Sequence, residues 1–245
     1  MKIVLGLVVV VVALADGRRT WSKWNSGRRP SKASFDAIWT STGTVPDKLS
    51  QVPAEPLYIN FGGLRVTPNM TIDTSQLIKK PTLKWNADPS ALYTLLIEDN
   101  DITSAPIKWA QWLVTNIPGS NVNNGEEVAT YVPSFHFTIS ADGQLDTTTP
   151  ETSRHLVLIY KQKGRIDMSG QAGCNSGFLE PPRITDHDQL QAAYDLEGPV
   201  AGNFYRVKYS KGWTEYYICY LSKCIGSPYP LPIAGVNDSD VCPTP

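Results

Sequence analysis

The sequence predicts a mainly β fold with a few peripheral helices. From residue 57 onward, short segments that are wholly apolar or that alternate apolar with polar residues are separated by Gly, Pro, Asn and Asp turns. Only residues 186–194 have a clear helical pattern, with Asp186 as the N-cap and apolar residues on one face. The length allows one large domain or two small ones, and one domain explains the order of segments better.

The predicted strands follow one another without a repeat. They are residues 57–61, 64–66, 70–73, 82–85, 93–97, 107–116, 127–132, 135–140, 155–162 and 200–207. The strand over 127–132 is expected at a sheet edge. The strand over 135–140 is followed by Ala-Asp-Gly, which is a hairpin signal. Before these strands, we expect one helical turn over 34–39 with Ser34 as its cap, and a second short helix over 45–49.

The first residues have the pattern of a targeting segment. Met1-Lys2 is followed by an apolar run over residues 3–15 that ends in Ala-Leu-Ala. A basic start, a short apolar region and small residues at its end predict a signal peptide over 1–15, cleaved after Ala15. An uncleaved anchor is the alternative, although the run is short for a membrane span. No second apolar stretch is long enough to cross a membrane, so we expect a secreted, extracellular protein.

Composition shifts divide the remainder into three parts. Residues 16–50 form a polar, basic arm with the two short helices. Residues 51–225 form the single β domain. Residues 226–245 form an extended C-terminal tail that contains Cys and Pro.

Export also determines how the cysteines are interpreted. An exported chain with an even number of cysteines is expected to form disulfides, and the four here are Cys174, Cys219, Cys224 and Cys242. The sequence leaves all three pairings open. A zinc site is the alternative, but the spacings are unsuitable and no His lies near these cysteines. Asn69 and Asn237 each begin an N-x-Ser/Thr sequence and are candidate N-glycosylation sites.

Charge and motifs argue against several function classes. The chain has 22 basic and 23 acidic residues, which gives no electrostatic basis for binding nucleic acid or an anionic membrane surface. No P-loop, dinucleotide-binding glycine motif, nucleophile elbow or zinc-protease motif is present. We therefore expect a protein that is not an enzyme, with no catalytic residues, no cofactor and no metal.

Two acids follow the most apolar predicted strand of the first half. The strand over 93–97 leads directly to Asp99 and Asp101, with Asn100 between them. One interpretation is a strand end closed by Asx turns. The other is a site in which two carboxylates bind a ligand or orient a neighbour, with Arg154 as the candidate neighbour.

Four segments in order resemble the phosphatidylethanolamine-binding protein family. They are Y-T-L-L-I-E-D-N-D-I-T-S over 93–104, W-A-Q-W-L-V-T-N over 109–116, R-H-L-V-L-I-Y-K-Q over 154–162 and Y-D-L-E-G-P-V-A-G-N-F over 194–204. The family patterns are Y-T-L-x-x-x-D-P-D-x-P-S, W-H-H-x-x-x-x-N, G-x-H-R-Y before an apolar strand, and G-x-P-V-A-G-x-F. The resemblance covers roughly residues 57–222. It implies an antiparallel β-sandwich with a small anion pocket at one edge, and partners that are phospholipid head groups, other small anions or proteins.

The resemblance also implies which residues would line that pocket, and where this chain departs from the pattern. By position, the ligand-binding candidates are Asp99, Asp101, Trp109, Gln111, Arg154 and His155. Ala110 and Gln111 replace two histidines, Ser153 replaces a third, and His155 replaces a tyrosine. Because these changes remove hydrogen-bond donors while both carboxylates stay, phosphate affinity should be weaker than is usual in the family, or absent.

The three histidines are interpreted separately. His155 is either a packed imidazole or a donor that replaces the lost tyrosine. His136 alternates with Phe135 and Phe137 and is expected to line the altered pocket. His187 lies in Asp-His-Asp at the start of the predicted helix and is expected to be solvated.

Two functions from different classes remain. The first is a secreted protein that binds a small anion or a phospholipid head group in a partly degenerate pocket. The second is a non-catalytic extracellular interaction or matrix protein, or a modulator resembling a protease inhibitor, that keeps the fold without the anion site.

Overall fold

The computed structural model describes residues 31–101, 108–134, 138–139, 145–146, 152–168, 183 and 185–209. The predicted signal peptide, the tail over 226–245, all four cysteines, His136 and Asn237 lie outside these residues. Within the described residues, no helix is both long enough and apolar enough to span a membrane.

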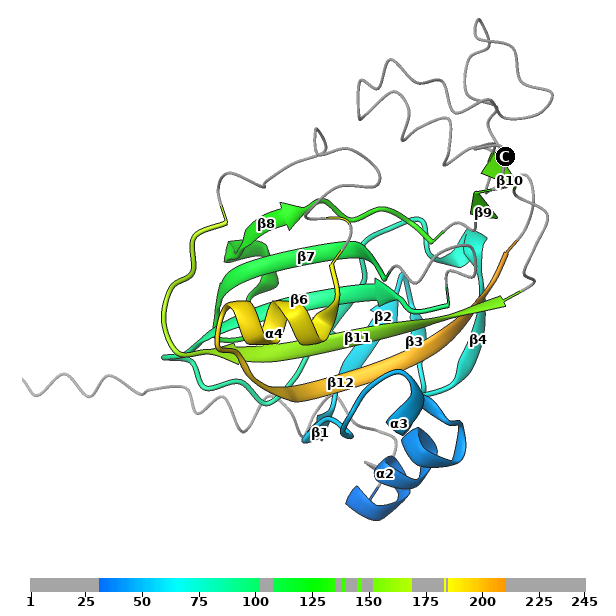
Figure 1. Ribbon diagram of the computed structural model, residues 1–245, viewed down its shortest axis with the longest axis horizontal. Coiled ribbons are helices and arrows are strands. Elements are labelled where there is room, and N and C mark those ends of the chain that lie inside the picture. The colour runs from blue at the N-terminus through cyan, green and yellow to red at the C-terminus, as the bar shows by residue number, and fades with distance from the viewer. Residues whose placement is uncertain are drawn as a thin grey trace, which may run out of the picture.

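Two β-sheets form the framework of the described residues (Figure 1). The larger sheet has the strand order β1-β12-β11-β6-β7-β8, and β4 also pairs with β12. Its strands are β1 (Glu55–Pro56), β4 (Met70–Asp73), β6 (Leu92–Asp99), β7 (Trp109–Pro118), β8 (Glu126–Ala129), β11 (Thr152–Gln162) and β12 (Glu197–Lys208). The central pairs β12-β11, β11-β6, β6-β7 and β7-β8 are antiparallel, whereas β1 and β4 run parallel to β12.

The smaller sheet has the order β3-β2-β5, formed by β2 (Tyr58–Phe61), β3 (Leu64–Val66) and β5 (Thr82–Lys84). A separate pair, β9 (Thr138–Ile139) with β10 (Leu145–Asp146), is antiparallel, as the Ala-Asp-Gly turn between them predicts. The strand over 127–132 begins one residue earlier than expected, as β8, and does form one edge of the larger sheet.

The larger sheet is buried on both faces. On one face Leu95 and Ile97 of β6 join Ile59 of β2 in the core between the sheets. On the opposite face Leu96 of β6 joins Trp39 of α2 in a second core beneath the helices. Successive residues of a strand point to opposite faces, so β6 must be apolar at nearly every position to fill both cores. This explains the continuous apolar run that the sequence has there.

Three helices accompany the larger sheet: α2 (Lys32–Ser41), α3 (Thr44–Asp47) and α4 (His187–Ala193) (Figure 1). The helix α4 begins after Asp186, whose side chain accepts from the Asp188 and Gln189 amides, as predicted. Two short 3₁₀ helices are η1 (Thr74–Gln76) and η2 (Val122–Asn124).

The prediction of a single turn capped by Ser34 is wrong. The N-cap of α2 is Ser31, whose Oγ accepts from the Ser34 amide at 3.2 Å, and the helix continues to Ser41. The reason is tertiary: Phe35 and Trp39, one turn apart, are both buried against the sheet. The second short helix also differs, because α3 begins at Thr44 and Val45 within it is extended (φ −115°, ψ 126°).

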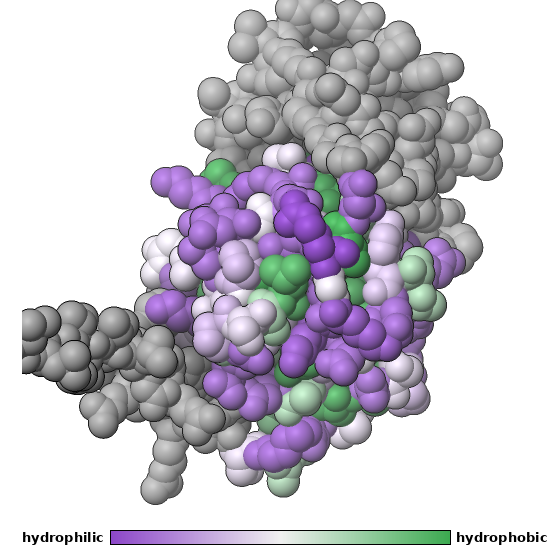
Figure 2. Space-filling model, turned by 90° about the vertical axis from the view of Figure 1, so that its left-hand side faces the viewer, coloured by the Kyte–Doolittle hydropathy of each residue, from purple (hydrophilic) through white to green (hydrophobic). Residues whose placement is uncertain are grey.

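Over the described residues, the exposed surface has no extended apolar area. Ile78 is the large hydrophobic side chain that is exposed there. Figure 2 shows one side of the molecule, where hydrophilic residues surround small separate apolar spots.

Candidate functional site

The two predicted acids lie at the end of β6, and the strand reaches further than expected. Asp99 is its last residue, and Asp101 follows two positions later. Alternation places Asp99 on the face of Ile97, towards the core between the sheets, and Glu98 on the opposite, helix-covered face. The sequence pattern therefore contains three acids that belong to three different surroundings.

Asp99 belongs to a buried polar group on the inner face, which we name the inner cluster: Asp99, Ser153, His155 and Tyr209. The hydroxyl of Tyr209 donates to Asp99 Oδ2 at 3.2 Å, and that of Ser153 to the same oxygen at 3.4 Å. His155 Nε2 lies 2.8 Å from Ser153 Oγ, 3.1 Å from the Tyr209 hydroxyl and 3.6 Å from Asp99 Oδ2. Ser153 and Tyr209 also hydrogen-bond to each other. Three strand ends thus direct their polar groups to one point.

Burial changes the protonation of the inner cluster. It raises the pKa of Asp99 to about 7, an effect that the Asp101 charge increases and the hydrogen bonds from the Asp101 amide, Tyr209 and Ser153 partly oppose. Burial also lowers the pKa of His155 to about 3, so its imidazole is neutral at physiological pH. The His155 ring stacks on that of Tyr205, with centroids 5.5 Å apart, and its Nδ1 is buried without a hydrogen-bond partner.

Gln111 lies at a β-bulge of β7. Ile97 of β6 is opposite Trp112 and Glu98 is opposite Ala110, so Gln111 is the extra residue on β7. Its amide nitrogen donates to Ser134 Oγ at 2.9 Å, and both residues are buried. Gln111 therefore satisfies its side chain within the protein, and no contact joins it to the inner cluster among the described residues.

Trp109 is also buried, but it contacts a cation that the sequence did not predict. The guanidinium of Arg183 lies 5.2 Å from the centre of the Trp109 ring. Arg183 is itself buried and donates to the carbonyls of Ala110 and Gln111 at 3.1 and 3.2 Å. Burial lowers the pKa of Arg183 to about 10, which leaves it charged. This arginine stabilises the backbone at the positions where the family pattern has two histidines.

Asp101 connects three parts of the chain. Its Oδ1 lies 2.6 Å from Lys48 Nζ, and its Oδ2 accepts from the Arg154 backbone amide at 2.9 Å. Its own amide donates to Asp99 Oδ1 at 3.1 Å, which is the Asx-turn geometry expected for the Asp-Asn-Asp segment. Lys48 also donates to the Asn100 carbonyl at 3.0 Å.

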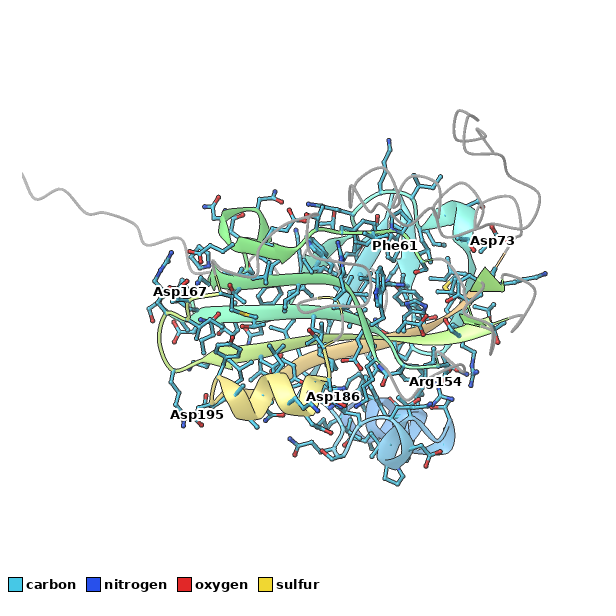
Figure 3. The ribbon with its side chains drawn as sticks, turned by 45° about the horizontal axis from the view of Figure 1, so that its top comes forward. Phe61, Asp73, Arg154, Asp167, Asp186 and Asp195 are labelled. Atoms are coloured by element: carbon cyan, nitrogen blue, oxygen red, sulfur yellow. The ribbon has the colours of Figure 1, made fainter. Side chains whose placement is uncertain are left out.

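Arg154 does not join the inner cluster. It lies between Ser153 and His155 on β11, so its side chain points to the opposite face, beside α3 (Figure 3). There its Nη1 donates to Thr44 Oγ1 at 3.1 Å. The carboxylates of Asp99 and Asp101 make no hydrogen bond to its guanidinium. Of the six ligand-binding candidates, the structure brings only Asp99 and His155 together through direct side-chain contact.

The prediction that His187 is solvated is wrong. His187 is buried, and its Nδ1 lies 3.1 Å from Glu98 Oε1, while its backbone amide donates to Glu98 Oε2 at 3.1 Å. Asn100 Nδ2 donates to Glu98 Oε1 at 2.7 Å. The local Asp-His-Asp pattern is polar, but α4 packs this end of the helix over Glu98 of β6. Sequence reasoning missed Glu98, because it stands between the apolar run over 93–97 and the Asp-Asn-Asp segment and matches no motif.

The start of α4 also gathers acids around His187. Atoms of Asp186, His187 and Asp188 lie within 4.8 Å of one another, a spacing compatible with a metal ion. However, Lys108 Nζ already lies 2.9 Å from Asp186 Oδ2 and 3.4 Å from His187 Nδ1. An ammonium group therefore already contacts two of the three residues of this group.

Replacing Asp99 by asparagine is expected to raise the free energy of unfolding above pH 7 by about 2 kcal/mol. This value is about half of the free energy that corresponds to the full pKa shift of Asp99. The folded chain holds the Asp99 proton more tightly than the unfolded chain, so stability falls as pH rises from 3.8 to about 7. Asp99→Asn removes this pH-dependent loss of stability. Urea unfolding at several pH values measures the free energy of unfolding of both proteins, and exposed Asp195→Asn is the control. An equal gain at pH 4 and pH 8 would contradict the expectation.

Asn69, a predicted glycosylation acceptor, lies within the described residues. It has positive φ (63°) in the turn between β3 and β4, and its Oδ1 accepts from Arg206 Nε at 3.0 Å. Thr71 of the same N-x-Thr sequence is exposed. We expect a mass decrease after glycosidase treatment of protein secreted from eukaryotic cells, and no such decrease at this site in Asn69→Gln. An unmodified tryptic peptide containing Asn69 would contradict this.

Comparisons with solved structures agree with the predicted fold. No protein-family model matches the chain. The chain is similar in structure to CG7054, at 26% identity and a TM-score of 0.55, over 74% of this chain and 97% of that one. It is also similar to a carboxypeptidase Y inhibitor solved with its cognate proteinase, at 14% identity and a TM-score of 0.54, over 73% and 96%. The chain has the fold of the phosphatidylethanolamine-binding proteins. The predicted antiparallel β-sandwich with peripheral helices is confirmed.

The chain is also similar in sequence to two curated proteins. A putative odorant-binding protein A5 of Drosophila melanogaster is 27% identical over 183 residues, which are 70% of this chain and 77% of that protein. A 26 kDa secreted antigen of Toxocara canis is 28% identical over 178 residues, which are 68% of this chain and 61% of the antigen. The match to the antigen therefore spans less than two thirds of that protein.

Proposed function

We propose that this chain is a secreted binding protein that takes a small oxyanion, free or as a phospholipid head group, at the inner cluster. The observation that carries the proposal is the convergence of the Ser153 and Tyr209 hydroxyls on Asp99, whose pKa is raised to about 7. The names of the two relatives, an odorant-binding protein and a secreted antigen, support an extracellular binding role.

The inner cluster suits an oxyanion only when Asp99 is protonated. A neutral carboxyl group donates a hydrogen bond, as do the hydroxyls of Ser153 and Tyr209. A carboxylate would instead repel the ligand, and neutral His155 supplies no positive charge. Binding is therefore coupled to proton uptake by Asp99, and the affinity increases as pH falls through about 7.

Sulfate is the most informative probe, because its charge is constant across this pH range. We expect its affinity, measured by calorimetry, to rise about tenfold from one pH unit above the Asp99 pKa to one unit below. In Asp99→Asn the pH dependence should disappear. Ser153→Ala should weaken binding about tenfold, the loss of one hydrogen bond to a charged ligand. Exposed Ser90→Ala is the matched control. Phosphorylethanolamine and phosphatidylethanolamine vesicles then distinguish a free anion from a lipid head group.

A second candidate is a protein-binding modulator that has kept the fold without the anion site. It is favoured by one observation: the inner cluster satisfies most of its polar groups internally and is buried. The likeness to the carboxypeptidase Y inhibitor concerns the fold alone at 14% identity. Absence of binding by sulfate, phosphorylethanolamine and vesicles at every pH would reject the small-ligand function and leave this one.

A hydrolytic role for Ser153 and His155 is not part of the proposal. In a Ser-His-Asp triad, the acid orients the imidazole through the nitrogen that the serine does not contact. Here Ser153 and Asp99 both lie on the Nε2 side, and Nδ1 has no partner. With a pKa of about 3, His155 would also be a poor general base at neutral pH.

A further inference from the structure

Two arginines lie directly opposite each other on the outer face of the larger sheet. Arg154 of β11 is paired in register with Arg206 of β12. The next pair, Leu156 with Phe204, belongs to the core beneath the helices, so both arginines face the same side as α2 and α3. Like charges directly opposite in an antiparallel pair repel and destabilise the sheet. An arrangement of this kind needs a compensating negative charge.

Direct ion pairs within the described part of the chain do not supply that charge. No carboxylate lies within the 4.0 Å ion-pair distance of either guanidinium in the part of the chain that the structure describes. Arg154 is 9% exposed, and besides the bond from its Nη1 to Thr44, its Nε is buried without a hydrogen-bond partner. Burial lowers the pKa of Arg154, the Asp101 charge partly restores it, and the Arg206 charge lowers it further. Arg206 donates its Nε to an uncharged amide oxygen, that of Asn69.

The neighbouring charges leave the same end of the sheet positive. Lys208, two residues beyond Arg206 on β12 and thus on the same face, is exposed. Asp73 is its register partner on β4, but its carboxylate accepts from the amide and hydroxyl of Ser75 and makes no ion pair with Lys208, Arg154 or Arg206. Asp101 is engaged by Lys48 and by the Arg154 amide. Asp47 of α3 is exposed, and its charge raises the pKa of Arg154 without forming an ion pair with it.

We propose that Arg154 and Arg206 form a second oxyanion site, between α3 and the ends of β11 and β12, for a phosphate or sulfate group. The planar guanidinium binds such groups with two hydrogen bonds, and the buried Nε of Arg154 is a donor that lacks a partner. The site is distinct from the inner cluster, because Ser153 and His155 on either side of Arg154 point to the opposite face of β11.

Heteronuclear NMR of the full chain tests this site directly. Sodium sulfate should shift the Arg154 Nε–H resonance, whereas sodium chloride at the same ionic strength should not. The resonance is assigned by its loss in Arg154→Lys. In Arg206→Gln, the sulfate-dependent shift should be lost and the affinity reduced at least about tenfold. Without sulfate, Arg206→Gln should melt at a higher temperature than the wild type, since the repulsion is removed.

The inner cluster supplies the control that separates the two sites. Ser153→Ala should leave the sulfate response of Arg154 unchanged, and Arg206→Gln should leave the pH-dependent binding at Asp99 unchanged. If Ser153→Ala or Arg206→Gln abolished both the sulfate-dependent shift of Arg154 and the pH-dependent binding at Asp99, there would be a single site and the proposal would be overturned. It is also overturned if sulfate and chloride shift the Arg154 resonance equally, since this would be charge screening. Inorganic phosphate and vesicles containing phosphatidic acid distinguish a free anion from a lipid phosphate.

Discussion

Trp39→Ala is expected to lower the free energy of unfolding by about 4 kcal/mol, the usual cost of deleting a fully buried large aromatic side chain. Trp39 has no exposed surface and packs against Phe204 of β12, with ring centroids 4.6 Å apart, and against Phe35 one turn earlier. Removing it leaves a cavity between α2 and the sheet. Urea unfolding followed by far-ultraviolet circular dichroism measures the change, because that signal does not depend on the deleted indole.

The same experiment tests the domain boundary predicted at residue 50. If α2 belongs to the cooperative unit of the sandwich, Trp39→Ala shifts the single transition of the whole domain. Exposed Thr40→Ala on the same helix is the matched control and should change stability by less than about 0.5 kcal/mol. A loss below about 1 kcal/mol for Trp39→Ala would instead place α2 outside the folded unit, as an independent arm.

His187→Ala is expected to lower the free energy of unfolding by about 3 kcal/mol at neutral pH, because it leaves the Glu98 carboxyl group buried without its charge partner. Burial raises the pKa of Glu98 above 4.5, and His187 opposes this only in part. Burial lowers the pKa of His187, but its hydrogen bond to Glu98 and the Glu98 charge outweigh this and raise it above 6.5. Folding therefore raises the pKa of both groups, and they form an ion pair where His187 is protonated and Glu98 is not.

The sign of the pH dependence follows from these directions. Both groups bind protons more tightly when folded, so the stability that they contribute is complete at low pH. The contribution of Glu98 falls as pH rises above 4.5, and that of His187 falls as pH rises above 6.5. The wild type should therefore lose stability above pH 6.5. In His187→Ala, a second change, Glu98→Gln, should recover at least about 1 kcal/mol, since no charge is then buried. Exposed Gln189→Ala on α4 is the control. A double variant no more stable than His187→Ala would contradict the ion-pair explanation.

The strands could be predicted because their cause is local. The middle of each of β6 and β11 is buried on both faces and is apolar over residues 95–97 and 156–160, so these runs are visible in the sequence. The α4 cap was predictable for the same reason, since Asp186 bonds to amides two and three residues later. By contrast, the length of α2 depends on Phe204, which is far away in the sequence.

The candidate site was less predictable, and particular residues explain why. Gln111 was placed in a pocket by its position in a motif, but a bulge and Ser134 determine where its amide goes. Tyr209 carried no motif, yet it is the main hydroxyl donor to Asp99. His187 looked solvated because its sequence neighbours are acids, whereas its spatial neighbour is buried Glu98.

The sequence by itself determined the β class of this protein, the succession of strands along the chain and the pair of acids at the end of β6. Each depends on side-chain period, turn residues or segment order, and all of these are properties of the linear chain. Only the tertiary structure decided that Asp99 joins Ser153 and His155, while Arg154 between them joins Thr44 and faces Arg206. The physical reason is that β11 is buried on both faces, so adjacent residues of one motif enter different environments, and the packing on each face determines their charge and partners.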